Sequence, residues 1–251
     1  MPLLTRDTED YSFMRDKNKM KEQLVNELDT MRKRIAELEA LESEHKRTEK
    51  ALKEDIEKLR RVLNETVVTL ASTVETRDPH SAGHQRHVAK LACAIAREMG
   101  LSDENLKEIN LAALVHDIGK LSVPAELLTK PGRLAETEHL VIKSHPRTGC
   151  EILEKVDFPH SIVQIVLQHH ERMNGFGYPQ GLSGEDIILE ARLLAVADVV
   201  EAIASQRSYR KALGMDKALK EITSFKGLLY DPEVVDACVR VFNEKRFKWD
   251  E

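Results

Sequence analysis

An all-α fold is the prediction for this chain of 251 residues, and three features of the sequence carry it. Neither glycine nor proline occurs between Leu3 and Asp78, in a segment rich in charged residues, which is typical of a long helix. After that segment, apolar residues recur at the three- and four-residue spacing of amphipathic helices. No stretch shows the alternation of apolar and polar residues that predicts a half-buried strand.

The bulk composition is typical of a soluble globular protein. The chain is 41% hydrophobic and 32% charged, and its net charge of −5 argues against a general nucleic-acid-binding face. Three widely spaced cysteines, Cys93, Cys150 and Cys238, favour core thiols in a reducing compartment over a disulfide framework. There is no secretory signal and no apolar run of about 18 residues, so we expect a cytoplasmic protein without a membrane span.

Residues 1–68 predict a helical signalling linker built on a coiled coil. Its apolar residues follow the alternating spacing of a heptad seam that weakens at residues 42–50; they are Leu24, Leu28, Met31, Ile35, Leu38, Leu52, Ile56, Leu59 and Leu63. If residues 17–77 formed one helix, it would be roughly 90 Å long and would have no core of its own. We therefore expect a homodimer through residues 24–63; a solvated helix packed on its own domain is the alternative.

Residues 69–251 predict a helical domain with recognisable boundary signals. Apolar residues between Val88 and Ala96 predict an amphipathic helix that Gly100 closes. Ser102 is placed as the N-cap of the next helix, which should end near Gly119. Further helices are expected at 135–154, 160–171, 189–205, 216–225 and 231–245.

Nine of the ten histidines lie between residues 80 and 170, and this grouping indicates a metal site. His116 is followed directly by Asp117, and the doublet at 169–170 repeats the adjacent arrangement ahead of a Gly-Tyr-Pro turn. Imidazoles with bridging carboxylates hold two divalent ions that clamp a phosphoryl oxygen and lower the pKa of a shared water. A surface turn after a helix is the alternative, and it explains the glycines but not the double histidine.

Asp198 is an acid inside an otherwise apolar segment. Burial of a carboxylate is costly unless the group is paired or binds a cation. Asp198 is therefore a candidate metal ligand, and a buried salt bridge or helix cap is the alternative.

The sequence resembles the HD-GYP subgroup of the HD phosphohydrolase superfamily. The matching motifs occur in family order across nearly all of residues 70–245; they are RDPHSAGH (77–84), HDIGK (116–120), PAELLTKPGRL (124–134), SHPRTG (144–149), HHERMNGFGYPQGL (169–182), ARLLAVADVVEAIASQRSYR (191–210) and DPEVVD (231–236). The resemblance implies an HD-domain helical bundle with a GYP extension and a centre of two or three divalent ions, often iron or manganese. It also implies hydrolysis of cyclic di-GMP to linear pGpG and, in some members, onward to GMP.

The resemblance assigns roles to individual residues of this sequence. The implied metal ligands are His84, His116, Asp117, His145, His169, His170 and Asp198, with Asp117 bridging the ions. Asp117 and Lys120 are the implied catalytic residues. Lys120, four residues after His116 on the same face of the predicted helix, would contact phosphate or assist the leaving group; a lysine that satisfies the helix C-terminus is the alternative. The implied substrate contacts are Lys120, Arg207, Arg210 and Glu201.

Four positions depart from the family pattern. His80 stands where many members have tyrosine and some trinuclear members have a glutamate ligand, so it is a candidate ligand of a third ion, four residues before His84. His87 replaces the usual arginine, and Asn174 replaces the usual aspartate of the GYP loop. Glu201 replaces an aspartate near the substrate. None of these changes removes a core ligand, so they bear on rate and substrate preference.

The leading hypothesis is a metal-dependent cyclic di-GMP phosphodiesterase, regulated through its coiled coil by an upstream sensory domain or another signalling protein. Two alternatives stay open. One is an HD-GYP module that binds or signals with little catalysis, and the other is an HD hydrolase of another cyclic dinucleotide or of a nucleotide.

Overall fold

The computed structural model describes residues 6–77, 83–130, 132–156, 158–205, 214–244 and 247–249 of the chain. Every regular element within these ranges is a helix, which confirms the all-α prediction. Strand-like pairing within them is limited to two isolated bridges, Asn174 with Ser183 and Lys226 with Tyr230. The contacts divide the chain into two compact units, residues 1–62 and 63–251.

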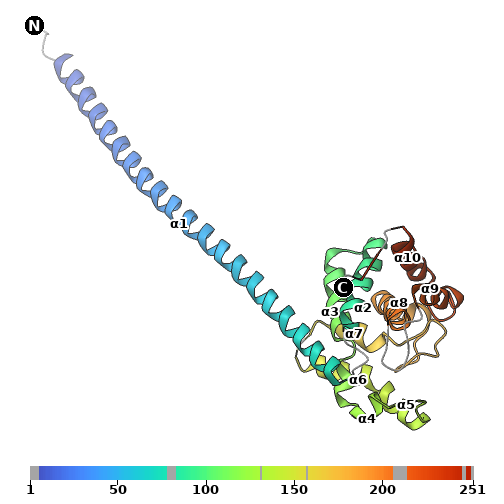
Figure 1. Cartoon of the computed structure of the whole chain (residues 1–251). Coiled ribbons are helices and arrows are strands. Elements are labelled where there is room, and N and C mark those ends of the chain that lie inside the picture. The colour runs from blue at the N-terminus through green and yellow to red at the C-terminus, as the bar shows by residue number, and fades with distance from the viewer. Residues whose placement is uncertain are drawn as a thin grey trace, which may run out of the picture. The chain divides into compact units, whose positions relative to one another are not determined.

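The N-terminal helix α1 runs without a break from Arg6 to Arg77 (Figure 1). It includes the weak patch at residues 42–50, where an ion pair one turn apart, Lys46 with Glu42 at 2.6 Å, supports the helix. The apolar side chains of the predicted seam are 41–69% exposed in the single chain. The described residues of one chain thus leave the seam uncovered, as a second copy would require.

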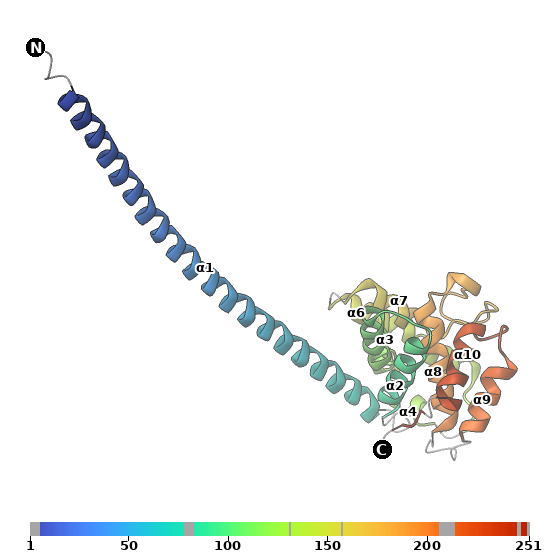
Figure 2. The same cartoon turned by 90° about the horizontal axis from the view of Figure 1, so that it is seen from above.

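The C-terminal unit contains a helical bundle (Figures 1 and 2), whose central contacts are those among four helices. These are α2 (His84–Glu98), α3 (Asp103–Val115), α7 (His160–Gln168) and α8 (Leu189–Ala204). Helix α2 packs against α3 and α8, and α7 also packs against both. Buried aliphatic side chains such as Ile95, Ile109 and Ile165 line these contacts. Each contributes about 1.5–3 kcal/mol, so the packing fixes the helix ends relative to one another.

Shorter elements surround this bundle. They are the 3-10 helices η1 (Ile118–Ser122) and η2 (Gly184–Asp186) and the helices α4 (Ala125–Leu128), α5 (Glu136–Lys143), α6 (His145–Glu154), α9 (Met215–Ser224) and α10 (Pro232–Asn243). Helix α6 packs against α7 and η1, and α9 and α10 pack against α8. Across the described ranges, no helix has both the length and the apolar character to cross a bilayer.

Two predicted boundary signals are confirmed. Gly100 follows α2 with a φ of 78°, a backbone conformation that favours glycine. Ser102 caps α3, because its Oγ accepts a hydrogen bond from the backbone N–H of Asn105 at 3.2 Å. Helix α3 ends at Val115, one turn before the predicted end near Gly119, and η1 continues the chain.

The stretch predicted at 135–154 is helical, but it is divided into two helices. Helix α5 ends at Lys143 and α6 begins at His145, with Pro146 in its first turn. Proline has no N–H, so the carbonyl of Ile142, four residues earlier, loses the partner that would continue the helix. That carbonyl instead accepts a hydrogen bond from the His145 side chain, which becomes important at the site.

Candidate metal centre

The predicted metal ligands come from five segments of the C-terminal unit. His84 begins α2, His116 and Asp117 follow α3, His145 begins α6, His169 and His170 follow α7, and Asp198 lies within α8. The structure brings all seven together in three overlapping groups, each with donor atoms within 4.8 Å of one another. The groups are His84, His116 and Asp198; His116, Asp117 and His169; and His145, His169 and His170. Because the groups share members, they form one continuous cluster of donors.

Three of the histidines are oriented by the same device. The Nδ1 atoms of His116, His145 and His169 each donate a hydrogen bond to the carbonyl three residues earlier, at 2.6–2.7 Å. The acceptors are the carbonyls of Ala113, Ile142 and Val166. These carbonyls lie in the last turns of α3, α5 and α7, where a helix leaves its carbonyls without helical partners. A proton on Nδ1 leaves the lone pair on Nε2, the atom that binds a metal.

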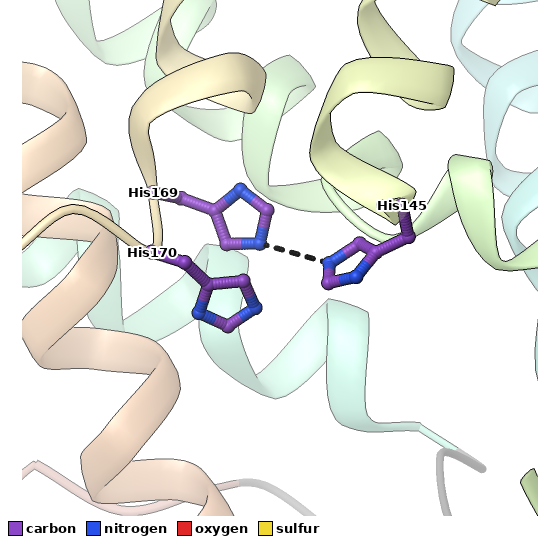
Figure 3. Close-up of side chains that lie close together, drawn as sticks. All are labelled: His145, His169 and His170. Atoms are coloured by element: carbon purple, nitrogen blue, oxygen red, sulfur yellow. Dashed lines mark hydrogen bonds between the residues drawn. The ribbon is translucent and has the colours of Figure 1, made fainter. Parts of the chain in front are cut away.

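His145, His169 and His170 form a group that fits a cation (Figure 3). The Nε2 atoms of His145 and His169 are 3.4 Å apart, and the rings of His169 and His170 have centroids 4.1 Å apart. Since Nδ1 carries the proton in the first two rings, their Nε2 lone pairs face one another and repel unless a cation lies among them. Burial lowers the pKa of all three imidazoles, which keeps them neutral and able to bind a divalent ion.

Asp117 reaches two of the histidine groups. Its Oδ1 lies 3.3 Å from Nε2 of His145, and its Oδ2 lies 3.6 Å from Nε2 of His116. Burial raises the pKa of this carboxyl, but interactions led by the positive charge of Lys120 outweigh burial and hold its pKa well below the usual range. The result is an ionised carboxylate with one oxygen toward each group, as a bridging ligand requires.

His84 and Asp198 belong to the remaining group. Oδ1 of Asp198 lies 3.2 Å from Nε2 of His84. Burial lowers the pKa of His84, yet hydrogen bonds to Asp198 and Glu201 raise it to about 9. The pKa of Asp198 is held well below its usual value by the hydrogen bond to His84 and by nearby imidazoles, against the effect of burial. The Nε2 atom of His84 can thus bind either a proton or a divalent cation, but not both.

Lys120 contacts Asp117 rather than sharing a helical face with His116. The expectation of a shared α-helical face is wrong, because α3 ends at Val115 and the chain tightens into η1. This turn places Nζ of Lys120 2.6 Å from Oδ2 of Asp117. The lysine side chain keeps 17% exposure and that of Asp117 only 4%, so the ammonium is the solvent-accessible member of this pair.

The loop after His170 folds back over that histidine. The buried carboxylate of Glu171 holds the loop by accepting three backbone N–H groups at 2.7–3.2 Å, those of Gln180, Gly181 and Leu182. The Tyr178 ring lies against the His170 ring, with centroids 4.7 Å apart. At Gly177 a Cβ would lie 2.4 Å from backbone atoms of Glu171 and Arg172, so only glycine allows this close approach. The Gly-Tyr-Pro turn therefore covers the second histidine of the doublet.

Several predicted residues are placed differently or lie outside the structure. His80, Arg207 and Arg210 lie outside the described residues, so a third ion and the arginine contacts stay predictions. Asn174 stabilises the GYP loop, because its Oδ1 accepts the backbone N–H of Phe176 at 3.1 Å. Glu201 is only 2% exposed and contacts Nδ1 of His84, a placement that disfavours direct contact with substrate.

Sequence reasoning missed a cation beside the centre. Nζ of Lys143, at the end of α5, lies 5.3 Å from the centroid of the Tyr178 ring, within the range of a cation–π contact. Tyr178 in turn covers His170. The available signal was the position of this lysine two residues before a predicted ligand, His145, but only the fold brings the GYP loop beneath it.

Comparisons with known proteins agree with this architecture. A family model described as "HD domain" matches residues 68–234. The chain is similar to the "Cyclic di-GMP phosphodiesterase response regulator RpfG" of Xanthomonas campestris pv. campestris, with 44% identity over 178 residues, 70% of this chain and 47% of that protein. It is also similar to the "3'3'-cGAMP-specific phosphodiesterase 3" of Vibrio cholerae, with 36% identity over 177 residues, 70% of this chain and 38% of that protein.

A solved structure has the same fold. It is a crystal structure of a cyclic GMP-AMP specific phosphodiesterase of V. cholerae (V-cGAP3), with a TM-score of 0.57 and 18% identity, covering 72% of this chain and 49% of that chain. The chain spans about half or less of the length of the curated relatives it matches.

Proposed function

We propose, from the premise that this chain belongs to the HD domain family in its HD-GYP subgroup, that it hydrolyses cyclic di-GMP to pGpG with two divalent metal ions. Further hydrolysis to GMP, which the resemblance implies for some members, is an extension of this proposal. The observation that carries the proposal is the cluster of seven donors, in which three imidazoles are locked with Nε2 toward the other ligands. Iron or manganese suits this mixture of nitrogen and carboxylate ligands. A third ion would involve His80.

The residues at the centre would have different roles in the reaction. Divalent ions at these donors would polarise the phosphate and lower the pKa of a shared water. Asp117 keeps its two oxygens toward two groups of nitrogen donors. The ammonium of Lys120, which donates a hydrogen bond to that carboxylate, would contact a phosphate oxygen or the departing ribose oxygen.

Further cations position the phosphodiester. Lys143 adds positive charge beside the GYP loop. Arg207 and Arg210 would hold the phosphates, since guanidinium groups bind phosphate oxygens in pairs. Positioning of this kind lowers the entropic part of the barrier.

A second cyclic dinucleotide, 3'3'-cGAMP, is a candidate substrate. The support is the relative named for that specificity, which shares 36% identity with this chain. Both molecules present the same phosphodiester to the metal centre, so a choice between them depends on contacts to the bases.

One experiment tests the hydrolytic function. The protein is purified without oxygen, its metals are counted by elemental analysis, and cyclic di-GMP and 3'3'-cGAMP are incubated with it in parallel. We expect about two ions per chain and conversion of cyclic di-GMP to pGpG, followed by chromatography over time. Faster turnover of 3'3'-cGAMP would favour the second substrate. Full metal content without any product would favour the binding module.

The N-terminal helix supports a regulatory homodimer. Its seam from Leu24 to Leu63 is exposed in the single chain, and pairing with a second copy would bury it. One relative is named a response regulator, and an upstream sensory domain or signalling protein acting through this helix is part of the proposal. A change in helix register or dimer packing would carry the signal to the bundle.

Charges placed in the seam should separate the dimer. We expect Leu28→Glu with Ile35→Glu to give monomers at micromolar concentration, because like charges at facing core positions cannot be desolvated. Light scattering after size-exclusion chromatography measures the mass. Ala36→Glu with Ala40→Glu, exposed positions outside the seam, is the matched control and should remain dimeric. A wild-type chain that is monomeric throughout would rule out the seam as a dimer interface.

A further inference from the structure

His84 is oriented differently from the other ligand histidines. His116, His145 and His169 use carbonyls from the last turn of a helix, but His84 is the first residue of α2. No helical carbonyl precedes a residue at that position, since a helix start presents N–H groups instead. The Nδ1 of His84 donates to a side chain from another helix, the Oε2 of Glu201 on α8.

Helix α8 holds the His84 ring at both nitrogens. Asp198 and Glu201 are three residues apart, so they project from the same face of the helix. Asp198 meets Nε2 at 3.2 Å, and Glu201 meets Nδ1. Glu201 thereby does for His84 what a backbone carbonyl does for the other three, fixing the tautomer that leaves Nε2 for a metal.

Glu201 is itself held by two further side chains. Its Oε1 accepts a hydrogen bond from Oγ of Ser205 at 2.7 Å and from Nδ1 of His87 at 3.4 Å. His87 lies one turn after His84 on α2, so the same two helices form both contacts. With 2% exposure, the carboxylate of Glu201 is shielded from water, which strengthens each of these contacts.

The C-terminal segment packs against His87. Trp249 donates a hydrogen bond from Nε1 to the carbonyl of His87 at 3.3 Å, and the two rings have centroids 5.8 Å apart. Trp249 also packs on Phe242 of α10 and on Phe247, with centroids 5.9 and 5.7 Å away. A chain of contacts therefore runs from the C-terminal aromatic residues through His87 and Glu201 to His84.

We propose that Glu201, His87 and Trp249 are positioning residues for the metal ligand His84, with Glu201 orienting the imidazole and the C-terminal aromatic segment keeping His87 against Glu201. The inference rests on the metal centre of the proposed function but not on its substrate. It predicts an asymmetric centre: the ion that needs His84 depends on this support, and the ion held by His145, His169 and His170 does not.

Manganese binding tests the proposal without any use of hydrolysis. The full chain, freed of metal by chelation, is titrated with Mn²⁺, and electron paramagnetic resonance counts the free ion. For Glu201→Ala we expect the affinity for one of the two ions to fall by about tenfold or more. This is a typical effect of losing the hydrogen-bond partner of a ligand histidine. The other ion should keep its wild-type affinity. Glu201→Gln, which retains an oxygen acceptor for Nδ1, should restore part of the loss.

The aromatic end of the chain is tested in the same way. Trp249→Ala should weaken the same single ion, by a smaller factor, and Trp249→Phe should retain most of the affinity because it keeps the packing. The control is Asp231→Asn, which alters another buried carboxylate that caps α10 and pairs with Arg192. It should leave both manganese affinities unchanged.

The outcomes separate this proposal from the proposed function. Two wild-type affinities in Glu201→Ala would overturn the positioning role, and so would equal weakening of both ions in a folded variant. A wild-type chain that binds two ions but hydrolyses neither cyclic dinucleotide would count against the proposed function. The selective loss of one ion in Glu201→Ala would then still support the positioning role.

Discussion

Replacement of His116 and Asp117 by alanine together should abolish hydrolysis of cyclic di-GMP, with a fall of at least about 10³-fold, because the phosphate loses its electrostatic stabilisation. His116 belongs to two of the three donor groups, and Asp117 is the carboxylate that reaches both His116 and His145. Their removal leaves the group of His145, His169 and His170 intact but separates it from the group around His84. Elemental analysis should therefore show at most one ion per chain, together with the loss of product.

The control for this variant is His139→Ala, which removes an exposed histidine on α5. It should retain both the metal content and the rate of the wild-type chain. Circular dichroism checks that the double variant is still helical. Retained turnover in a folded double variant would contradict the assignment of this cluster as the catalytic centre.

The sequence was sufficient to name the seven side chains that the structure gathers into one cluster. All seven predicted ligands lie in one cluster, because each motif places its histidine or aspartate at the end of a helix or on its inner face. Sequence reasoning did not find what orients them. The carbonyl partners of His116 and His169 depend on where α3 and α7 end, and helix ends are the least certain part of any prediction from sequence.

Two differences between prediction and structure have the same cause, a helix that ends earlier than predicted. The helix predicted at 135–154 is broken next to Pro146, whose missing N–H was visible in the sequence, and the break frees the carbonyl that orients His145. Lys120 was assigned to the face of His116 because α3 was predicted to be too long. Glu201 is a different case: its contact with His84 joins residues 117 positions apart and follows only from the packing of α2 on α8.

Gly119→Ala should disrupt the centre through the backbone alone. A Cβ at this position would lie 1.9 Å from the carbonyl oxygen of His145 and 2.6 Å from the backbone nitrogen of Gly149. Both atoms belong to the main chain of α6, so no side-chain rotation relieves the overlap, and η1 must move away from α6. Overpacking of a core typically lowers the free energy of unfolding by about 1–3 kcal/mol. We expect the loss in this variant to be at or above the upper end of that range.

That movement would also separate the ligands. Gly119 lies between Asp117 and Lys120 and packs against the backbone of His145, so displacement of η1 carries the Asp117 carboxylate away from His145. We expect loss of bound metal and, in the chelated protein, a melting temperature lower by roughly 6–12 °C, since about 3 kcal/mol corresponds to that shift in a domain of this size.

Gly149→Ala is the matched control for the steric argument. It lies at the same contact between η1 and α6, but a Cβ there would first meet the side chain of Val166, at 3.3 Å, so a side-chain shift of a few tenths of an ångström relieves the overlap. We expect a smaller fall in melting temperature and retention of both ions. Equal effects of the two substitutions would show that general crowding, rather than the contact of Gly119 with the His145 backbone, sets the geometry of the centre. Calorimetry of both variants after chelation compares their melting temperatures, and elemental analysis of both metal-loaded variants compares their metal content.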